Sequence, residues 1–340
     1  MTEFDALVVG AGVAGCASAL ELMSAGWRVA ILHKGEDVSA IESLSPAAVC
    51  DLKRLAIRTE SNLSEVVAWW GSEREARAVT PGAAIVRRCL LANNLRLRAI
   101  KGGAVVIENA KLLSIERFRT GWKLVHALPD GSHCRLSARY LVDATGRSSA
   151  IGRRLGAQRL THDQLFCISV SLHEPGLVGT WTESTSYGWW NLCCLRKEGT
   201  LCFYSTAQKI REAKQGITTR LYETRHLWRL LPTPVFGESM VRPCGSSRLV
   251  PCAGTGWIAV GDAASTLQPL ASAGVSKALR DARLVREALA HKPAEYDRSQ
   301  LAEFRSYVRQ LAQHYALEKR WSESPLWATR VAAPLTGSMQ

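Results

Sequence analysis

The chain has 340 residues, of which 47% are hydrophobic, and it carries a formal net charge of +13. This length is enough for one large domain or two ordinary ones with a sizeable core. No apolar run approaches the roughly 18 residues of a membrane span. Glu3 and Asp5 stand where a secretory signal peptide would carry basic residues. We therefore expect a cytoplasmic protein without a membrane span.

Ten cysteines are spread along the chain without a CxxC pair or a zinc-type cluster with histidine. Without a secretion signal such thiols are expected to stay reduced, so we predict no metal site. The basic residues are scattered and form no compact tract, which argues against nucleic-acid binding. The excess positive charge instead fits a solvated basic surface or an acidic protein partner.

A glycine-rich junction near the N-terminus is the strongest local signal. An apolar run ends at Gly10 and passes through Gly12 and Gly15 into a stretch, about residues 13–24, that we expect to be helical. In this GxGxxG arrangement the first glycine makes a tight turn, the second lets a pyrophosphate approach the backbone, and the third packs the helix against the strand. The free N–H groups of the helix then face the phosphates. The junction therefore predicts a dinucleotide site.

The next expected strand departs from the usual dinucleotide pattern at its end. Residues 27–32 form this strand, and the acidic residue that contacts the ribose belongs directly after it. This chain has His33 and Lys34 there, which can hydrogen-bond a ribose or favour a phosphate. Residues 103–107 read as another buried strand, in which Val106 is a further candidate cofactor contact.

Two more stretches before residue 150 carry groups that can reach the same ligand. A helix is expected over about residues 85–100, with Arg88 near its start, where a cation opposes the helix dipole and suggests an anion nearby. A hairpin over about residues 122–136 leads into a strand that ends at Asp143 and Gly146. This second strand-to-glycine junction is suited to closing over the ligand.

The sequence pattern changes after residue 150. Residues 151–242 hold strand-like runs joined by loops rich in Trp, Gly and Thr, and they predict a substrate domain with a sheet laid over the cofactor. A buried strand at residues 257–260 then ends at Gly261 and Asp262, the kind of strand end where open α/β sheets bind ligands. We therefore assign residues 1–150 and 243–292 to a discontinuous cofactor domain and residues 293–340 to a C-terminal helical segment.

Three signals in this order, the GxGxxG loop, residues 143–147 and Gly261-Asp262, resemble the FAD-dependent monooxygenase fold of the para-hydroxybenzoate hydroxylase type, which includes the tryptophan halogenases. The finer resemblance is to flavoproteins of the LodB, GoxB and QhpG kind, which accompany quinone-cofactor oxidases or amine dehydrogenases and help to form tryptophylquinone. Residues 42–48, 68–72, 187–190, 256–264 and 315–327 carry it. It implies an α/β fold with a Rossmann-like FAD-binding domain, a β-sheet substrate domain and C-terminal helices.

The motifs and the resemblance together assign a set of residues to the FAD site. These residues are Gly10, Gly12, Gly15, His33, Lys34, Arg88, Val106, Asp143, Gly146, Gly261, Asp262, Ala273 and Gly274. By resemblance, Arg88 reaches the cofactor from its helix, and Asp262 binds the ribityl or pyrophosphate region. Backbone groups near Ala273 and Gly274, at a helix N-terminus, would face the flavin edge. The family pattern is not kept at Ile41 and Gln268.

The same resemblance implies a reaction. It describes an FAD-dependent monooxygenase that hydroxylates a tryptophan side chain of a partner oxidase precursor during quinone cofactor biogenesis. No second GxGxxG is visible, so NAD(P)H would bind transiently or a separate flavin reductase would supply electrons. Trp189, Trp190 and Pro269 are candidates to line the substrate pocket, with ordinary sheet core as the alternative for the two tryptophans. No catalytic acid or base is assigned.

Three other functions use the same fold, because fold alone does not determine function. A halogenase that resembles the tryptophan enzymes needs an early lysine and a Trp-x-Trp-x-Ile-Pro motif. Residues 59–71 contain no lysine, and residues 189–193 do not fit the motif, so halogenation is disfavoured. A small-molecule aromatic hydroxylase and a non-catalytic, flavin-containing assembly factor stay open.

Overall fold

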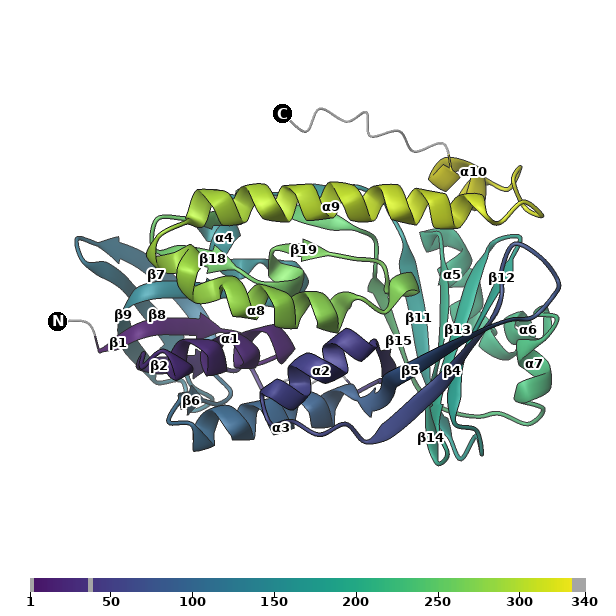
Figure 1. Cartoon of the computed structure of the whole chain (residues 1–340), viewed down its shortest axis with the longest axis horizontal. Coiled ribbons are helices and arrows are strands. Elements are labelled where there is room, and N and C mark those ends of the chain that lie inside the picture. The colour runs from purple at the N-terminus through teal and green to yellow at the C-terminus, as the bar shows by residue number, and fades with distance from the viewer. Residues whose placement is uncertain (1–2, 36–38, 332–340) are drawn as a thin grey trace.

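The computed structural model describes residues 3–35 and 39–331 and contains two eight-stranded sheets at opposite ends of the molecule (Figure 1). The long helix α9 (Pro293–Ala316) runs across both ends. A third sheet has three strands, which are β10 (Gln158–Thr161), β16 (Ser247–Val250) and β19 (Ser265–Thr266). The mixed α/β class predicted from the sequence is confirmed.

The first sheet has a parallel core in the order β18-β9-β1-β2-β6. Its strands are β1 (Phe4–Val9), β2 (Val29–Leu32), β6 (Val105–Ile107), β7 (Lys111–Phe118), β8 (Gly121–Ala127), β9 (His133–Asp143), β17 (Ala253–Gly254) and β18 (Trp257–Ala259). Helix α1 (Val13–Ser24) packs against α3 (Arg88–Lys101) and α8 (Gly274–Ala290). Because helices cover the parallel strands, β2 is buried at every position, which explains its unbroken apolar sequence.

The second sheet is assembled from two distant parts of the chain. Its order is β15-β11-β14-β13-β12-β4-β5-β3. The strands are β3 (Ile41–Leu44), β4 (Ser61–Trp69), β5 (Ala76–Arg87), β11 (Phe166–His173), β12 (Gly179–Thr185), β13 (Gly188–Leu195), β14 (Glu198–Ser205) and β15 (Val235–Pro243). The remaining short helices are α2 (Pro46–Arg54), α4 (Ala150–Arg154), α5 (Ala207–Gln215), α6 (Ile217–Tyr222) and α7 (Leu227–Leu230).

The structure corrects the predicted boundary of the cofactor domain. Residues 1–150 do not form one unit, because β3, β4 and β5 belong to the second sheet, where β4 pairs in parallel with β12. Local patterning indicates that a segment is extended but not which sheet edge accepts it. The helix predicted from about residue 85 also begins later, because Ile85 and Val86 are buried in β5 and only Arg88 opens α3. Branched side chains of this kind favour a strand.

Helix α9 joins the two halves of the molecule. Near its start, the hydroxyl of Tyr296 donates to the carbonyl of Ala259 in β18 at 3.0 Å. Near its end, the indole N–H of Trp189 in β13 donates to the hydroxyl of Tyr315 at 3.2 Å. Helix α10 (Pro325–Val331) follows, and residues 332–340 of the predicted helical segment lie outside the described residues. None of the helices in the described ranges is long and apolar enough to cross a membrane.

A buried carboxylate fastens the segment between α9 and α10 to the second sheet. Glu318 is 2% exposed, and its Oε2 accepts the N–H of Gly71 at 2.9 Å and the hydroxyl of Ser184 at 2.5 Å. Arg320 donates to the same oxygen at 2.6 Å. Burial alone would raise the pKa of Glu318, but the hydrogen bonds from Arg320, Ser184 and Gly71 outweigh it and hold the pKa below its usual range. This network explains why the 315–327 region has an acidic residue at position 318 and a basic residue at position 320.

The burial of His126 in β8 predicts a pH-dependent stability. Its side chain is 2% exposed, its Nδ1 has no hydrogen-bond partner within residues 3–35 and 39–331, and burial lowers its pKa from the ordinary value of 6.5. Between the folded-state pKa and 6.5, the unfolded chain binds a proton at His126 more readily than the folded chain does. The free energy of unfolding therefore falls as the pH drops below 6.5 toward the folded-state pKa. Urea unfolding at pH 7 and pH 5 should show this loss.

The variant His126→Phe should reduce the difference between the two pH values, while His133→Gln at an exposed site of the neighbouring strand should leave it as in the wild type. A residual slope is expected, because burial also lowers the pKa of His314. Equal pH dependence in His126→Phe and the wild type would contradict the assignment.

Candidate functional site

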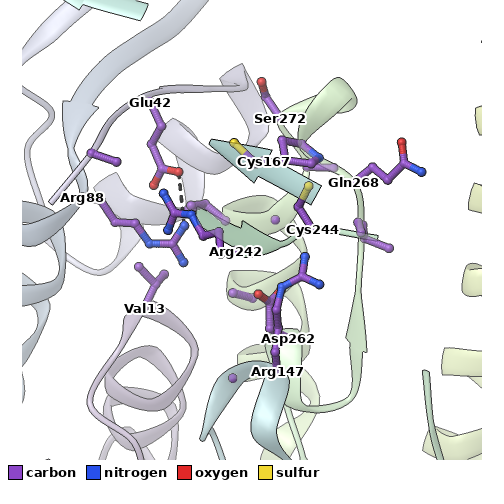
Figure 2. A pocket seen from close by; sticks show the side chains of 18 of the residues that line it. Val13, Glu42, Arg88, Arg147, Cys167, Arg242, Cys244, Asp262, Gln268 and Ser272 are labelled. Carbon is purple, nitrogen blue, oxygen red and sulfur yellow. Dashed lines mark hydrogen bonds and ion pairs between the residues drawn. The ribbon is translucent and has the colours of Figure 1, made fainter. Parts of the chain in front are cut away.

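A cavity of about 480 Å³ lies between the two sheets and draws residues from both (Figure 2). The β1–α1 loop contributes Gly12 and Val13, and the segment after β18 contributes Asp262. The second sheet contributes side chains of β11, β13, β14 and β15, while the start of α8 contributes Ala273 and Gly274. The cavity therefore lies where the sequence predicts the cofactor to meet its substrate.

The three glycines of the β1–α1 loop differ in what surrounds them. At Gly10, with φ of +108°, a Cβ would lie 2.2 Å from the carbonyl oxygen of Ala144, and at Gly15 it would lie 1.9 Å from the carbonyl oxygen of Gly10. At Gly12 a Cβ would meet nothing within 4 Å, because this residue is exposed to the cavity. No side chain caps α1, so its first N–H groups are available to an anion.

Asp143 has a structural role that differs from its prediction as a cofactor contact. Its carboxylate is fully buried and is absent from the cavity wall. One oxygen accepts the N–H of Thr145 at 3.0 Å, and the other accepts the N–H groups of Ile151 at 3.0 Å and Gly152 at 2.9 Å. These hydrogen bonds occupy both carboxylate oxygens and order the loop that brings Gly146 to the cavity.

A buried ion pair holds the loop that carries Asp262. Gly261 has φ of +58°, and a Cβ there would lie 2.7 Å from the Cβ of Ala14. Its N–H donates to Asp281 at 2.9 Å, and its carbonyl accepts from the Nζ of Lys277 at 3.1 Å. Lys277 and Asp281 lie 2.5 Å apart at 4% and 0% side-chain exposure. Asp262 is thereby placed in the cavity wall by two residues of α8.

Arg88 and Glu42 form a pair at the edge of the cavity. The Nη1 of Arg88 lies 3.3 Å from Oε2 of Glu42, and this carboxylate raises the pKa of the guanidinium (Figure 2). The other oxygen of Glu42, Oε1, is buried and has no hydrogen-bond partner among the residues that the structure describes. With Arg147 and Arg242, the cavity holds three guanidinium groups. Open helix amides, excess cations and an acceptor without a partner fit a dinucleotide that presents phosphates and hydroxyl groups.

His33, Lys34 and Val106 lie outside the cavity wall. His33 is 5% exposed, and its Nε2 lies 3.7 Å from a carboxylate oxygen of Glu108. Because Leu32 of β2 pairs with Ile107 of β6, Glu108 follows the neighbouring strand at the same edge of the sheet. Glu108 was not predicted as a site residue from the sequence, although an acidic residue directly after a predicted strand could have indicated it. A ribose contact by this group of residues stays a prediction.

Trp189 and Trp190 do not line the cavity, which corrects their prediction as pocket residues. They are 1% and 0% exposed and point to opposite faces of the second sheet, because side chains alternate along a strand. Trp189 stacks on Tyr204 with ring centroids 3.8 Å apart, so Tyr204 lies in the wall and Trp189 behind it. Trp190 stacks on Phe203 in the core of the other face. The third candidate, Pro269, does line the cavity.

The wall made by the second sheet was missed by the sequence analysis. It contains three cysteines, Cys167, Cys202 and Cys244, together with Tyr204 and Asn191. Burial raises the pKa of Cys244 to about 12, so this thiol is neutral at pH 7. The period-two pattern of residues 165–172 shows alternation, but it does not tell which face meets the cofactor.

Gln268 couples the cavity to the C-terminal helix. It is 1% exposed, and its Oε1 accepts the hydroxyl of Tyr315 at 2.7 Å. Its backbone N–H donates to the hydroxyl of Tyr307 at 2.7 Å. Both tyrosines come from α9, so the position at which this chain leaves the family pattern is held by residues from the C-terminal helix.

Comparisons with known proteins agree with this site. A family model described as an FAD binding domain matches residues 5–46, which contain β1, the glycine loop and α1. The chain is 26% identical over 361 aligned positions to an FAD-dependent oxidoreductase, LodB of Marinomonas mediterranea, with 98% of both chains covered.

Solved structures show the same fold. The flavin-dependent halogenase CmlS matches with a TM-score of 0.83 at 18% identity, covering 97% of this chain and 68% of that one. The peptidyl tryptophan dihydroxylase QhpG, described as essential for tryptophylquinone cofactor biogenesis, matches with a TM-score of 0.77 at 23% identity, covering 99% and 81%. The likeness reaches over both sheets and the helices that join them.

The glycine loop offers a matched pair of variants. Gly12→Val should leave the free energy of unfolding within about 0.5 kcal/mol of the wild type, because its Cβ meets open space. It should weaken FAD binding more than tenfold, because the new side chain occupies the space next to the α1 amides. Gly15→Ala should instead cost about 2–3 kcal/mol, because its Cβ meets backbone. Urea unfolding and flavin titration measure the two effects. Unimpaired FAD binding by Gly12→Val would refute the proposed cradle.

The Lys277–Asp281 pair predicts a second effect on stability. Lys277→Met leaves the Asp281 carboxylate buried without its cation, which should cost about 3–5 kcal/mol and lower the flavin content of the purified protein. Lys292→Met, at an exposed ion pair, is the control and should change stability by less than about 0.5 kcal/mol. Similar unfolding curves for the two variants would show that the pair does not hold the loop.

The glycine loop, the charged cavity, the match to an FAD binding domain and the shared fold all lead to one cofactor. FAD is therefore the cofactor that these observations indicate. The chain has the fold that flavin-dependent hydroxylases and halogenases share, and its N-terminal part matches an FAD binding domain.

Proposed function

We propose that this flavoprotein hydroxylates a tryptophan side chain of a partner oxidase precursor during quinone cofactor biogenesis. The observation that carries the proposal is one cavity with two unlike walls. One wall offers helix amides and charged groups for FAD, and the other offers Tyr204 and the neutral thiol of Cys244 for an aromatic ring. The end-to-end similarity to LodB and the fold shared with QhpG support the same reaction class.

The chain's own residues would bind and orient rather than transfer protons. The loop around Gly12 would hold the pyrophosphate, and Asp262 and Arg88 would contact the rest of the cofactor. Bound FAD, once reduced, supplies the activation of dioxygen for transfer of an oxygen atom to an electron-rich ring. The N-terminus of α8 lines the cavity, and its dipole favours negative charge there. NAD(P)H or a separate flavin reductase would supply the electrons.

Water exclusion is the second task of the site. Trp189 covers the outer face of Tyr204, and both rings are at most 5% exposed. The hydrogen bond from Trp189 to Tyr315 joins this aromatic wall to α9, and Tyr315 in turn donates to Gln268. A rigid, largely apolar wall keeps the reacting ring in one place, which is what an oxygen transfer without an assigned acid or base requires.

Halogenation fits the cavity less well than oxygenation. A halogenase that resembles the tryptophan enzymes needs a lysine to handle hypohalous acid, and none of the cavity-lining residues in the described ranges is a lysine. The buried Lys277 is engaged with Asp281 and the carbonyl of Gly261. The likeness to CmlS therefore extends to the fold and not to this chemistry. A small-molecule hydroxylase and an assembly factor use the same cavity and are separated by experiment.

Co-expression with a quinone-cofactor oxidase precursor from the same genome tests the proposal. Intact mass spectrometry should show one or two added oxygen atoms on a precursor tryptophan with the wild type and none with Gly12→Val. Oxygenation that persists with this FAD-deficient variant would overturn the oxygenase role in favour of an assembly factor. An unmodified precursor alongside an oxygenated small aromatic compound would favour the small-molecule hydroxylase.

A further inference from the structure

One acceptor in the substrate wall is fixed in orientation and left without a donor. Asn191 of β13 lines the cavity, and its Nδ2 donates to the carbonyl of Trp181 at 3.3 Å. The same Nδ2 lies 3.3 Å from the hydroxyl of Thr180 and 3.2 Å from that of Thr182. A carbonyl can only accept, so it determines which end of the amide faces β12. The Oδ1 of Asn191 is therefore turned away from these three groups.

No group in the described part of the chain donates a hydrogen bond to this oxygen. On β14, the residues nearest to Asn191 on the same face are Cys202, directly opposite, and Tyr204, the next residue on that face. A thiol is a weak donor. The guanidinium of Arg242 is directed to the hydroxyl of Ser169. In the free protein, solvent in the cavity can serve Oδ1, and a bound ring that displaces this solvent must replace the donor.

We propose that Oδ1 of Asn191 accepts the N–H of an indole ring and thereby selects tryptophan among electron-rich aromatic substrates. Indole Nε1 only donates, so it is complementary to an oxygen that only accepts. A site built for this hydrogen bond rejects rings of the same size that lack the N–H, because the acceptor is then left unpaired. The inference rests on the proposed function and adds a residue that determines its specificity.

The position of Asn191 also explains how the ring would be oriented. The amide is held by three groups of β12, so its oxygen is fixed with respect to the sheet. The side chain of Tyr204 adds a flat surface on the same face. One directional hydrogen bond and one flat contact together define the plane and the rotation of a bound indole.

The test compares two probes of nearly equal shape on the FAD-loaded full chain. N-acetyl-tryptophanamide carries the indole N–H, and its benzothiophene analogue carries sulfur in that place. Equilibrium titration followed by the flavin spectrum should show about tenfold weaker binding of the analogue to the wild type. In Asn191→Leu the tryptophan probe should bind about tenfold more weakly, and the two probes should bind within twofold of each other. Thr182→Ser, which keeps the hydroxyl group beside the amide of Asn191, should keep the wild-type discrimination.

The outcomes separate this inference from the proposed function. Equal binding of both probes to the wild type overturns the role of Asn191, and this comparison needs no variant to fold. Equal rates of precursor oxygenation by the wild type and by flavin-loaded Asn191→Leu also overturn it, while the proposed function stands. If neither probe binds and the precursor is not oxygenated, the proposed function fails and the inference fails with it.

Discussion

The close approach of two backbones at the ends of β1 and β9 is the constraint on which the site depends. The strands run in parallel with Val9 opposite Asp143, and the N–H of Ala144 donates to the carbonyl of Val9 at 2.9 Å. A side chain at Gly10 or Gly15 would collide with backbone oxygen. Glycine at both positions lets α1 start against the strands, so that its unpaired amides point into the cavity.

Buried charge then orders the loops on either side of this junction. Asp143 is used up by backbone N–H groups, and the pair of Lys277 and Asp281 holds both polar groups of Gly261. A buried charge without a partner would lower the free energy of unfolding. The loops therefore keep the few conformations in which these side chains are paired. Asp143, Lys277 and Asp281 are not among the residues that line the cavity. The residues that they position, such as Asp262, do line it.

The second sheet supplies the other half of the site and is joined to the first by the C-terminal helix. Its wall of thiols, Tyr204 and Asn191 faces the β1–α1 loop across the cavity, and the proposed aromatic substrate would bind against this wall. Contacts of Tyr315 with Trp189 and Gln268 connect α9, the sheet and the cavity in one chain of hydrogen bonds. Helix α9 therefore contacts the cavity wall that the second sheet forms, although α9 and the strands of this wall are far apart in the sequence.

The glycine loop, Arg88 near the start of a helix, the Gly261-Asp262 turn and the α/β class could be predicted from the sequence, because they depend on spacing within short segments. That β3, β4 and β5 enter the second sheet, that Trp189 lies behind Tyr204 and that Asn191 lines the cavity became known from the three-dimensional arrangement. These features depend on strand pairing. A strand's pattern states that its two faces differ, but the partner strand and the covering helix decide which face meets the ligand.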